Sequence, residues 1–183
     1  MHRNRFVLLL PAIVLILASL ACGTTGGGGD DGGTGGGPAP IRQWAVSASA
    51  SSEFGSVDWA AAQAIGAPNT TECGDLVTAW ASSSSSGYDW LEVGFATPVV
   101  PTQINIHESY NPGQIVKVEV RDEGGSFHTV YQGSANVVSQ CPRVFTINLT
   151  DITYKVTAVM ITVDQTGYGD WDEIDAIELV GTP

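Results

Sequence analysis

Apolar and polar side chains alternate with a period of two along much of the chain after residue 90. Leu91, Val93 and Phe95, for example, are separated by Glu92 and Gly94. Successive side chains of a β-strand point to opposite faces of its sheet, whereas an amphipathic helix repeats its apolar positions every three or four residues. The pattern therefore predicts strands with one buried and one solvent-facing side, and it excludes a framework of helices.

Nine short segments have this alternation or are rich in β-branched and aromatic residues. They are Val46–Ala50, Val77–Ala81, Leu91–Phe95, Ile104–His107, Val116–Arg121, Phe127–Tyr131, Val144–Leu149, Val156–Val163 and Ile174–Val180. Only Asp58–Ile65 is predicted as a helix, with Asp58 as its N-cap and Gly66-Ala67-Pro68 as its stop signal. A chain of this length can bury about two-thirds of its unfolded surface in one core. We therefore predict an all-β sandwich with one short helix over residues 41–183.

The chain begins with a basic and then apolar segment that has the layout of a secretory signal. Arg3 and Arg5 precede an apolar run from Phe6 to Leu20, which is shorter than the roughly 20 residues that span a membrane. The stretch Ser19-Leu20-Ala21-Cys22 resembles the bacterial lipoprotein signal, in which the cysteine is acylated and becomes the new amino terminus. We therefore predict an exported lipoprotein held on the cell envelope through lipid on Cys22 alone. Plain secretion and a retained membrane anchor are the alternatives.

A Gly-rich tract separates this signal segment, residues 1–22, from the predicted sandwich. Residues 23–40 are rich in Gly, Thr and Asp and end with Pro38-Ala39-Pro40. Such a composition offers too little apolar surface to offset the entropy lost on ordering. The tract is therefore predicted to be a disordered tether.

The balance of charged residues excludes a polyanionic partner. The chain has 19 acidic and 7 basic side chains, a formal net charge of −12, and removal of Arg3 and Arg5 with the signal segment makes it −14. A protein of this charge repels phosphates instead of releasing their counterions, so nucleic acid is excluded as a partner. Binding to anionic lipid through a basic face is excluded for the same reason.

The three cysteines are consistent with export. If Cys22 carries lipid, the pair Cys73 and Cys141 remains, and exported domains favour joining such a pair as a disulfide. This bridge would close a loop of roughly 70 residues and, in the chain-entropy account, stabilise the fold by about 4 kcal/mol. A cysteine metal site or a cysteine nucleophile is the alternative, although no histidine is near either residue in the sequence.

Several stretches together resemble a known family of sandwich domains. Four segments have the order and spacing of the amino-terminal half of discoidin-type, galactose-binding-like jelly rolls, which they resemble. They are Ala48–Ser52, Ala64–Pro68, Thr78–Ser82 and Asp89–Phe95. Two later segments, Pro101–Gly113 and Asp172–Leu179, resemble a narrower branch of this family. That branch includes the scarf-like module of pappalysins and the sandwich of one leucine-rich-repeat F-box protein. The resemblance implies a galactose-binding-like jelly-roll β-sandwich that binds a ligand through loops at one end.

The resemblance also implies a structural calcium ion, the one cofactor to be expected. Many discoidin-like relatives hold it through a loop carboxylate, loop carbonyl groups, a Thr after that loop and a Glu near the start of the last strand. Thr78 matches the Thr, but the carboxylate position falls on Gly66 and the Glu position on Ala176. Because calcium accepts six to eight flexible oxygen ligands, three nearby residues are expected to replace the missing loop carboxylate and the missing Glu as ligands. They are Asn69, Asp75 and Asp175.

Aromatic residues in the predicted connections are the candidates for ligand contact. An aromatic ring in a loop stacks on the apolar face of a sugar, while nearby amides and carboxylates hydrogen-bond to its hydroxyl groups. The rings are Tyr88, Tyr110, Tyr168 and Trp171, and the polar partners are Asn111, Asp170 and Asp172. For Trp171, packing at the edge of the core is an alternative. The acidic cluster from Asp164 to Asp175 has three interpretations, which are solvent-exposed charges, a ligand- or ion-binding site, and a catalytic site.

The residues offer little chemistry for an enzyme. The two histidines of the sandwich lie in strand patterns, and the serines from Ser82 to Ser86 form no Gly-x-Ser-x-Gly elbow. We therefore predict a non-catalytic module that binds a carbohydrate or another cell-surface ligand, with Tyr168, Trp171 and a neighbour such as Tyr110 around one concavity. The alternatives are a protein-docking module without a sugar site and a small glycoside hydrolase with two facing acids in a cleft.

Overall fold

The computed structural model describes residues 38–183. The predictions for the signal segment 1–22, for lipid on Cys22 and for nearly all of the tether 23–40 lie outside the described residues. Within residues 38–183, no helix is long and apolar enough to cross a membrane. The elements are β1 (Ile41–Trp44), β2 (Ser47–Ala50), the 3-10 helix η1 (Ala61–Ala64), β3 (Tyr88–Tyr110), β4 (Ile115–Asp122), β5 (Phe127–Gln132), β6 (Arg143–Asn148), β7 (Val156–Asp164) and β8 (Glu173–Thr182).

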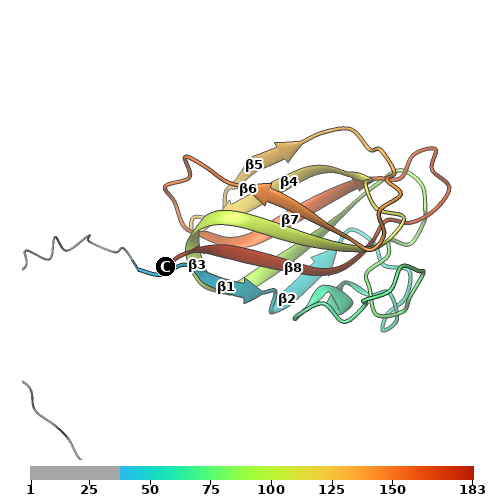
Figure 1. Ribbon diagram of the computed structural model, residues 1–183, viewed down its shortest axis with the longest axis horizontal. Coiled ribbons are helices and arrows are strands. Elements are labelled where there is room, and N and C mark those ends of the chain that lie inside the picture. The colour runs from blue at the N-terminus through green and yellow to red at the C-terminus, as the bar shows by residue number, and fades with distance from the viewer. Residues whose placement is uncertain (1–37) are drawn as a thin grey trace, which may run out of the picture. The chain divides into compact units, whose positions relative to one another are not determined.

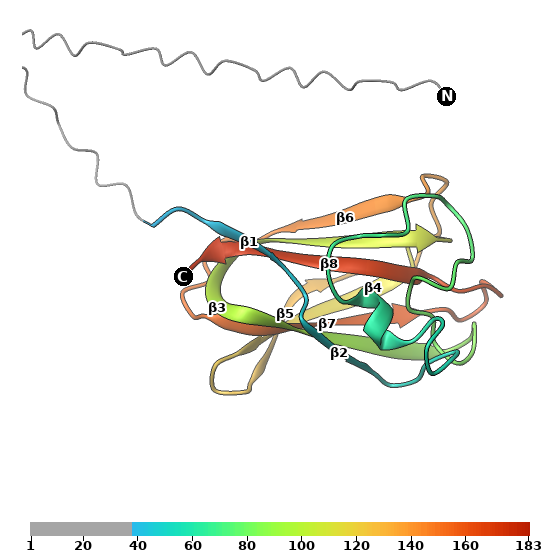
Figure 2. The same cartoon turned by 90° about the horizontal axis from the view of Figure 1, so that it is seen from below.

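The strands form two antiparallel sheets that face each other, as Figures 1 and 2 show. The first sheet has the order β1, β8, the second half of β3, and β6. The second sheet has the order β2, the first half of β3, β7, β4 and β5. The prediction of an all-β sandwich is therefore confirmed.

One strand belongs to both sheets. The first half of β3 pairs with β2 and β7, and from Val100 onward β3 pairs with β8 and β6. The register with β7 shifts between Gly94 and Val99, next to Pro98 and Pro101, which have no backbone N–H to donate to a ladder. In this region β3 bends from one sheet into the other (Figure 2).

The alternating side chains fill the space between the sheets. Leu91 and Val93 are fully buried, whereas Glu92 between them is partly exposed on the outer face. Inward side chains of both sheets meet in one cluster that includes Trp80. The Trp80 indole N–H donates to the carbonyl of Ser52 at 3.1 Å, so its burial leaves no donor unpaired.

The helix prediction is wrong. Instead of a helix over Asp58–Ile65, only Ala61–Ala64 forms one 3-10 turn. Trp59 has a left-handed backbone with φ of 53°, which is incompatible with a helix that starts at Asp58. The turn donates to a different acid, because the N–H of Ala61 forms its hydrogen bond with the Glu53 carboxylate at 3.0 Å.

Three strand predictions also differ from the structure. The segment Val77–Ala81 contributes a single bridge between Trp80 and Ile174, and no strand. Leu91–Phe95 and Ile104–His107 are two parts of the continuous strand β3. The first strand, β1, is missing from the prediction because its four residues show little alternation.

The predicted disulfide is confirmed. Cys73 is bonded to Cys141, which joins the long connection before β3 to the connection between β5 and β6. Both connections lie at the end of the sandwich where Tyr88 and Tyr110 are located.

Candidate ligand-binding site

Most of the long connections gather at one end of the sandwich, which we call the loop end. They are residues 51–60, 65–87, 111–114, 133–142 and 165–172. Figure 1 shows them on the side opposite the C-terminus. Because β3 runs away from this end in the second sheet and returns to it in the first, both of its terminal residues, Tyr88 and Tyr110, are located here. The fold thus brings together aromatic residues that are far apart in the sequence.

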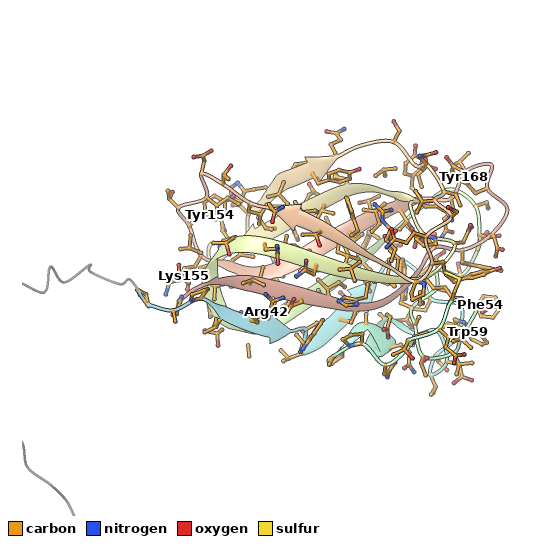
Figure 3. All side chains as sticks on the ribbon, viewed as in Figure 1. Arg42, Phe54, Trp59, Tyr154, Lys155 and Tyr168 are labelled. Carbon is orange, nitrogen blue, oxygen red and sulfur yellow. A yellow bond between two sulfur atoms is a disulfide. The ribbon has the colours of Figure 1, made fainter. Side chains whose placement is uncertain are left out.

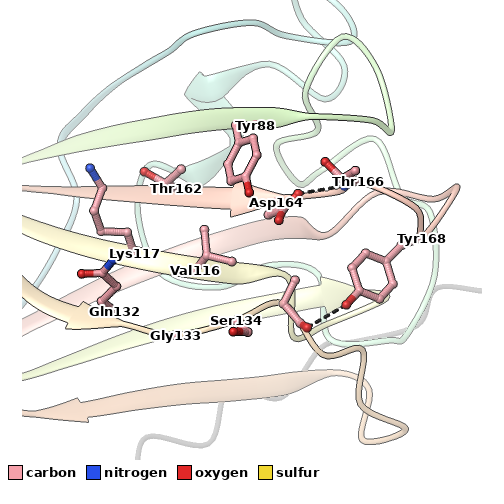
Figure 4. Close-up of a pocket in the computed structure, with 11 residues that line it drawn as sticks. Tyr88, Val116, Lys117, Gln132, Gly133, Ser134, Thr162, Asp164, Thr166 and Tyr168 are labelled. Atoms are coloured by element: carbon pink, nitrogen blue, oxygen red, sulfur yellow. Dashed lines mark hydrogen bonds between the residues drawn. The ribbon is translucent and has the colours of Figure 1, made fainter.

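A concavity of about 560 Å³ lies where the outer face of the second sheet meets this end. We call it the tyrosine concavity, because Tyr88 and Tyr168 both line it (Figure 4). Its polar lining comes from the strands and from the β5–β6 connection, and includes Lys117, Gln132, Ser134 and Asp164. The side chains of Tyr88 and Tyr168 are 68% and 39% exposed, so both rings are available to a ligand.

Hydrogen bonds fix the position of the Tyr168 ring. Its hydroxyl donates to the carbonyl of Ala135 at 2.7 Å, a bond that links the β7–β8 connection to the β5–β6 connection. Gly167 and Gly169 on either side have positive φ values of 83° and 74°, a conformation that glycine adopts without strain. The ring therefore projects from a tight turn into the concavity, as Figure 4 shows.

Asp164 supplies a negative charge next to Tyr88. Burial acts to raise the pKa of Asp164, but hydrogen bonds from Thr166 and Tyr88 outweigh burial and leave that pKa below its usual value. The Thr166 N–H donates to the carboxylate at 3.0 Å. The hydrogen bond to Asp164, together with its charge, raises the pKa of Tyr88. The concavity therefore presents an ionised acceptor beside a neutral phenol at neutral pH.

Tyr110, Asn111 and Asp170 do not line the tyrosine concavity. They lie where the end of β3 and the β3–β4 turn contact the β7–β8 connection. The Tyr110 hydroxyl donates to the Asp170 carboxylate at 2.7 Å, and this bond, with burial, raises the pKa of Tyr110 to about 12. Asn111 has a left-handed φ of 45° in the turn after β3. Its carbonyl accepts a hydrogen bond from the Gln114 side chain at 3.1 Å, which stabilises the turn.

Asp172 lies in the interior, where no surface ligand contacts it. Its side chain is completely buried, and its carboxyl group forms a hydrogen bond with the equally buried Glu108. Asp172 accepts the N–H of Gln114, and Glu108 accepts the N–H of Gly113, both at 2.8 Å. Burial is the main cause that raises the pKa of both carboxyl groups. This pair anchors the turn between β3 and β4.

Trp171 lines a second, smaller cavity of about 140 Å³ at the loop end. We call it the aromatic pocket, and its walls are Phe54, Trp59, Asp75, Ala81, Trp171 and Glu173. The expectation that Tyr168 and Trp171 share one concavity is therefore wrong. Figure 3 shows Phe54 and Trp59 beside each other and well apart from Tyr168.

Three of the four residues expected to hold calcium, Asn69, Thr78 and Asp175, meet around Thr70, whereas Asp75 lies elsewhere. Both oxygens of Asp175 accept backbone N–H groups, from Asn69 at 3.3 Å and Thr70 at 3.2 Å. The Thr78 hydroxyl is 2.6 Å from that of Thr70, while Asp75 interacts with Glu173. N–H groups directed at the carboxylate occupy the place of a cation, and no cluster of three or more His, Cys, Asp or Glu within residues 38–183 could hold a metal ion. Calcium stays a prediction that these contacts do not favour.

Several residues of both cavities escaped the sequence analysis. Lys117 is an outward position of β4, and the alternation alone marks it as solvent-facing. For Asp164 the sequence indicates only membership of the acidic cluster, with ligand binding as one of three interpretations. Phe54 and Trp59 lie in a segment without periodicity, so no pattern indicates that they meet Trp171. Glu173 belongs to the same acidic cluster, but its burial depends on the connection that covers it and has no signal in the sequence.

Comparison with known proteins places this geometry in a family. Residues 38–183 match the family described as Pappalysin-1, SD scarf domain, C-terminal. A search of the curated proteins gives no match.

Solved structures with a similar fold include two carbohydrate-binding modules and one enzyme. Chitosan-binding module 1 of a chitosanase/glucanase from Paenibacillus sp. IK-5 has a TM-score of 0.57 and 18% identity, covering 74% of this chain and 94% of that chain. The family 32 module of NanJ from C. perfringens, in complex with galactose, has a TM-score of 0.56 and 23% identity, covering 76% and 99%. Allantoicase from Saccharomyces cerevisiae has a TM-score of 0.53 and 16% identity, covering 73% and 39%.

Identities below 25% show the fold alone, and that fold is the galactose-binding-like jelly roll that the sequence predicts. The family match is of a different kind, because it covers residues 38–183 and thus more than half of the chain. The chain belongs to the family of pappalysin scarf domains.

Proposed function

We propose that the protein is a non-catalytic carbohydrate-binding module and that the tyrosine concavity holds the sugar. The observation that carries this proposal is the pair of exposed rings, Tyr88 and Tyr168, that line one concavity together with an ionised acceptor, Asp164. A sugar ring has an apolar face that stacks on an aromatic ring and an edge of hydroxyl groups that needs donors and acceptors. The concavity offers both kinds of contact.

The size of the concavity supports a ligand of at least one sugar ring. Sites for small molecules commonly enclose about 300–1,000 Å³, and the volume of about 560 Å³ lies in that range. Lys117, Gln132 and Ser134 line it together with Asp164, so hydrogen-bond donors and acceptors are both present. Two of the solved structures with this fold are named as carbohydrate-binding modules, which supports the class of ligand and leaves the sugar open.

The placement of the buried acids weighs against a glycoside hydrolase. Such enzymes hold two carboxyl groups about 5 Å or about 6.5–9.5 Å apart on either side of the substrate. Glu108 and Asp172 instead hydrogen-bond to each other, and both are buried. Their remaining oxygens accept the backbone N–H groups of the β3–β4 turn, which is a structural role.

A glycan-array screen of the protein, with and without a chelator, tests the proposal. We expect binding to at least one glycan, and we expect Tyr88→Ala and Tyr168→Ala each to weaken that binding by about tenfold, because each removes a stacking surface. Phe127→Ala is the matched control, since Phe127 is 41% exposed on β5 and does not line the concavity. Absence of any bound glycan, or full binding by both tyrosine variants, contradicts the proposal. A chelator that abolishes binding would support the calcium prediction.

We further propose that the protein is exported and anchored to the cell envelope through lipid on Cys22. The support comes from the sequence, in which an apolar run precedes Ser19-Leu20-Ala21-Cys22. Metabolic labelling with a fatty-acid analogue is expected to mark the protein in its native host and to leave a Cys22→Ser variant unmarked. Equal labelling of the two proteins, or no labelling of either, would contradict the anchor.

A further inference from the structure

The aromatic pocket combines three aromatic rings with two carboxyl groups. Phe54, Trp59 and Trp171 form its apolar walls, and Asp75 and Glu173 its acidic wall. Its volume of about 140 Å³ is well below the roughly 300 Å³ at which small-molecule sites begin. The pocket therefore accommodates one chemical group of a ligand, whereas a whole sugar ring with its hydroxyl shell is too large.

The three rings are held in place from several directions. Phe54 meets Trp59 and Trp171 edge-on, with centroid distances of 5.3 and 5.4 Å and interplanar angles of 77° and 79°. The Trp171 indole N–H donates to the carbonyl of Ser82 at 2.9 Å. Phe54 is nevertheless 52% exposed, so it forms an open rim through which a group can enter.

The backbone of Trp59 is strained at this site. Its φ of 53° is unusual for a bulky side chain and costs free energy. The strain is maintained by two hydrogen bonds, because the Trp59 N–H donates to Val77 and its carbonyl accepts from Ala81, both at 3.1 Å. This conformation directs the indole ring into the wall of the pocket.

Glu173 is a buried carboxyl group without a cationic partner. Only 1% of it is exposed, and its Oε2 accepts the N–H of Leu76 at 3.2 Å. No Lys, Arg or His within residues 38–183 forms an ion pair with Glu173 or Asp75. Burial of an acid without a countercharge is unfavourable, and a positively charged group in the pocket would remove that penalty.

We propose that the aromatic pocket binds a compact organic ammonium group, either the protonated amine of an amino sugar or a quaternary trimethylammonium group. Aromatic faces attract such cations through their quadrupoles, most strongly for Trp, and the carboxyl groups supply the opposite charge. A metal ion suits the pocket less, because calcium requires six to eight oxygen ligands and magnesium an octahedral shell. The site is separate from the tyrosine concavity, so it does not depend on the sugar contact proposed there.

Proton linkage provides an independent signature of this site. Burial, and then the hydrogen bond and charge of Asp75, raise the pKa of Glu173 to about 8. A bound cation favours the ionised carboxylate, so binding releases the Glu173 proton and the affinity rises between pH 6 and about 8. The other titratable groups that face Glu173 are Asp75 and Tyr110. Tyr110, with its pKa of about 12, stays neutral over this range.

The experiment measures binding of ammonium probes through the fluorescence of Trp59 and Trp171 and through calorimetry. Choline is compared with its neutral isostere 3,3-dimethylbutan-1-ol, and glucosamine with N-acetylglucosamine. Choline has no titrating proton on its ammonium group, so any pH dependence of its affinity comes from the protein. We expect saturable binding of at least one ammonium probe, little binding of its neutral counterpart, and an affinity that rises by up to about tenfold per pH unit below the pKa.

Matched variants locate the bound group. Phe54→Ala and Glu173→Gln are expected to weaken ammonium binding by about threefold or more, whereas Phe127→Ala, an equal truncation of an exposed ring, leaves it unchanged. Because Phe54 is exposed, its variant is expected to fold even if Glu173→Gln does not. Tyr88→Ala is expected to weaken glycan binding without changing choline binding, so failure of one proposed site is distinguishable from failure of the other.

Three results would overturn the proposal. They are the absence of binding by every ammonium probe, equal binding of the neutral isosteres, and full binding by Phe54→Ala. Binding of choline alone would identify a quaternary ammonium group, and binding of glucosamine alone would identify an amino sugar.

Discussion

Asp172 and Glu173 are neighbours in the chain, yet their buried carboxyl groups have different surroundings. Asp172 faces inward and shares a hydrogen bond with Glu108, whereas Glu173 lines the aromatic pocket with Asp75. Asp172 lies in the connection before β8, whereas Glu173 is the first residue of that strand. Burial penalises the charged form and raises the pKa of both carboxyl groups.

Stability is therefore expected to fall as the pH rises from about 5 to about 8. Folded Glu173 keeps its proton until its pKa of about 8, while the unfolded chain releases it near the ordinary value of 4.5. The native state therefore binds more protons than the unfolded state across this pH range, so the stabilisation that is present at low pH is lost as the pH rises. Glu108 and Asp172, whose pKa values are also raised, act in the same direction.

Urea denaturation at several pH values measures this slope. We expect Glu173→Gln, which stays neutral, to be less sensitive to pH than the natural protein. Glu123→Gln in the exposed β4–β5 turn is the control and should keep the full slope. A natural protein that becomes more stable between pH 5 and 8, or identical slopes in all three proteins, would disprove the assignment.

At the residue scale the sequence predicted the type of side chain better than its surroundings. Tyr88 and Tyr168 do line a concavity, because turn residues such as Gly167 and Gly169 place a ring at the surface. Asp172 was expected in the same site, but its burial depends on Glu108, which lies 64 positions earlier in the chain. A linear pattern contains no information on such a long-range pairing.

At the scale of the elements, β3 and β8 approach each other closely next to the bend of β3 between the sheets. Gly181 of β8 lies against the carbonyl of Val100 and the Cα of Pro101, and a Cβ atom at Gly181 would overlap this backbone. Neither neighbour is the flexible end of a side chain, so the overlap could be relieved only by a shift of a strand.

Gly181→Ala is expected to destabilise the protein by about 1–3 kcal/mol, the usual cost of overpacking. The free energy of unfolding from chemical denaturation measures the effect. Gly74→Ala is the matched control, since a Cβ there would meet only the Leu76 side chain at 3.8 Å. If the two variants are equally stable, the close approach of β3 and β8 does not exist in solution.

The elements themselves were predictable where alternation is regular. β4, β5, β6, β7 and β8 lie within a few residues of the predicted segments. The bend of β3 was not predictable, because Pro98 and Pro101 read as the end of one strand and the start of another. Trp59 similarly prevents the predicted helix, and its left-handed backbone is imposed by hydrogen bonds to Val77 and Ala81.

On the scale of the whole molecule, both candidate sites are at the loop end and share a covalent connection. The Cys73–Cys141 disulfide ties the segment that carries Asp75 to the connection that carries Ser134 and Ala135. The described chain starts, at residue 38, on the side opposite the loop end (Figure 1).

The passage of β3 through both sheets also limits how this chain can be divided or rearranged. A break at Val99 would divide an interior strand of both sheets, since β3 lies between β2 and β7 in one sheet and between β8 and β6 in the other. Circular permutation or insertion of a fused domain is accordingly tolerated at exposed connections such as residues 123–126, and not at the bend. The chain passes between the two layers within β3 and again at most of its connections, so neither layer is an autonomous building block.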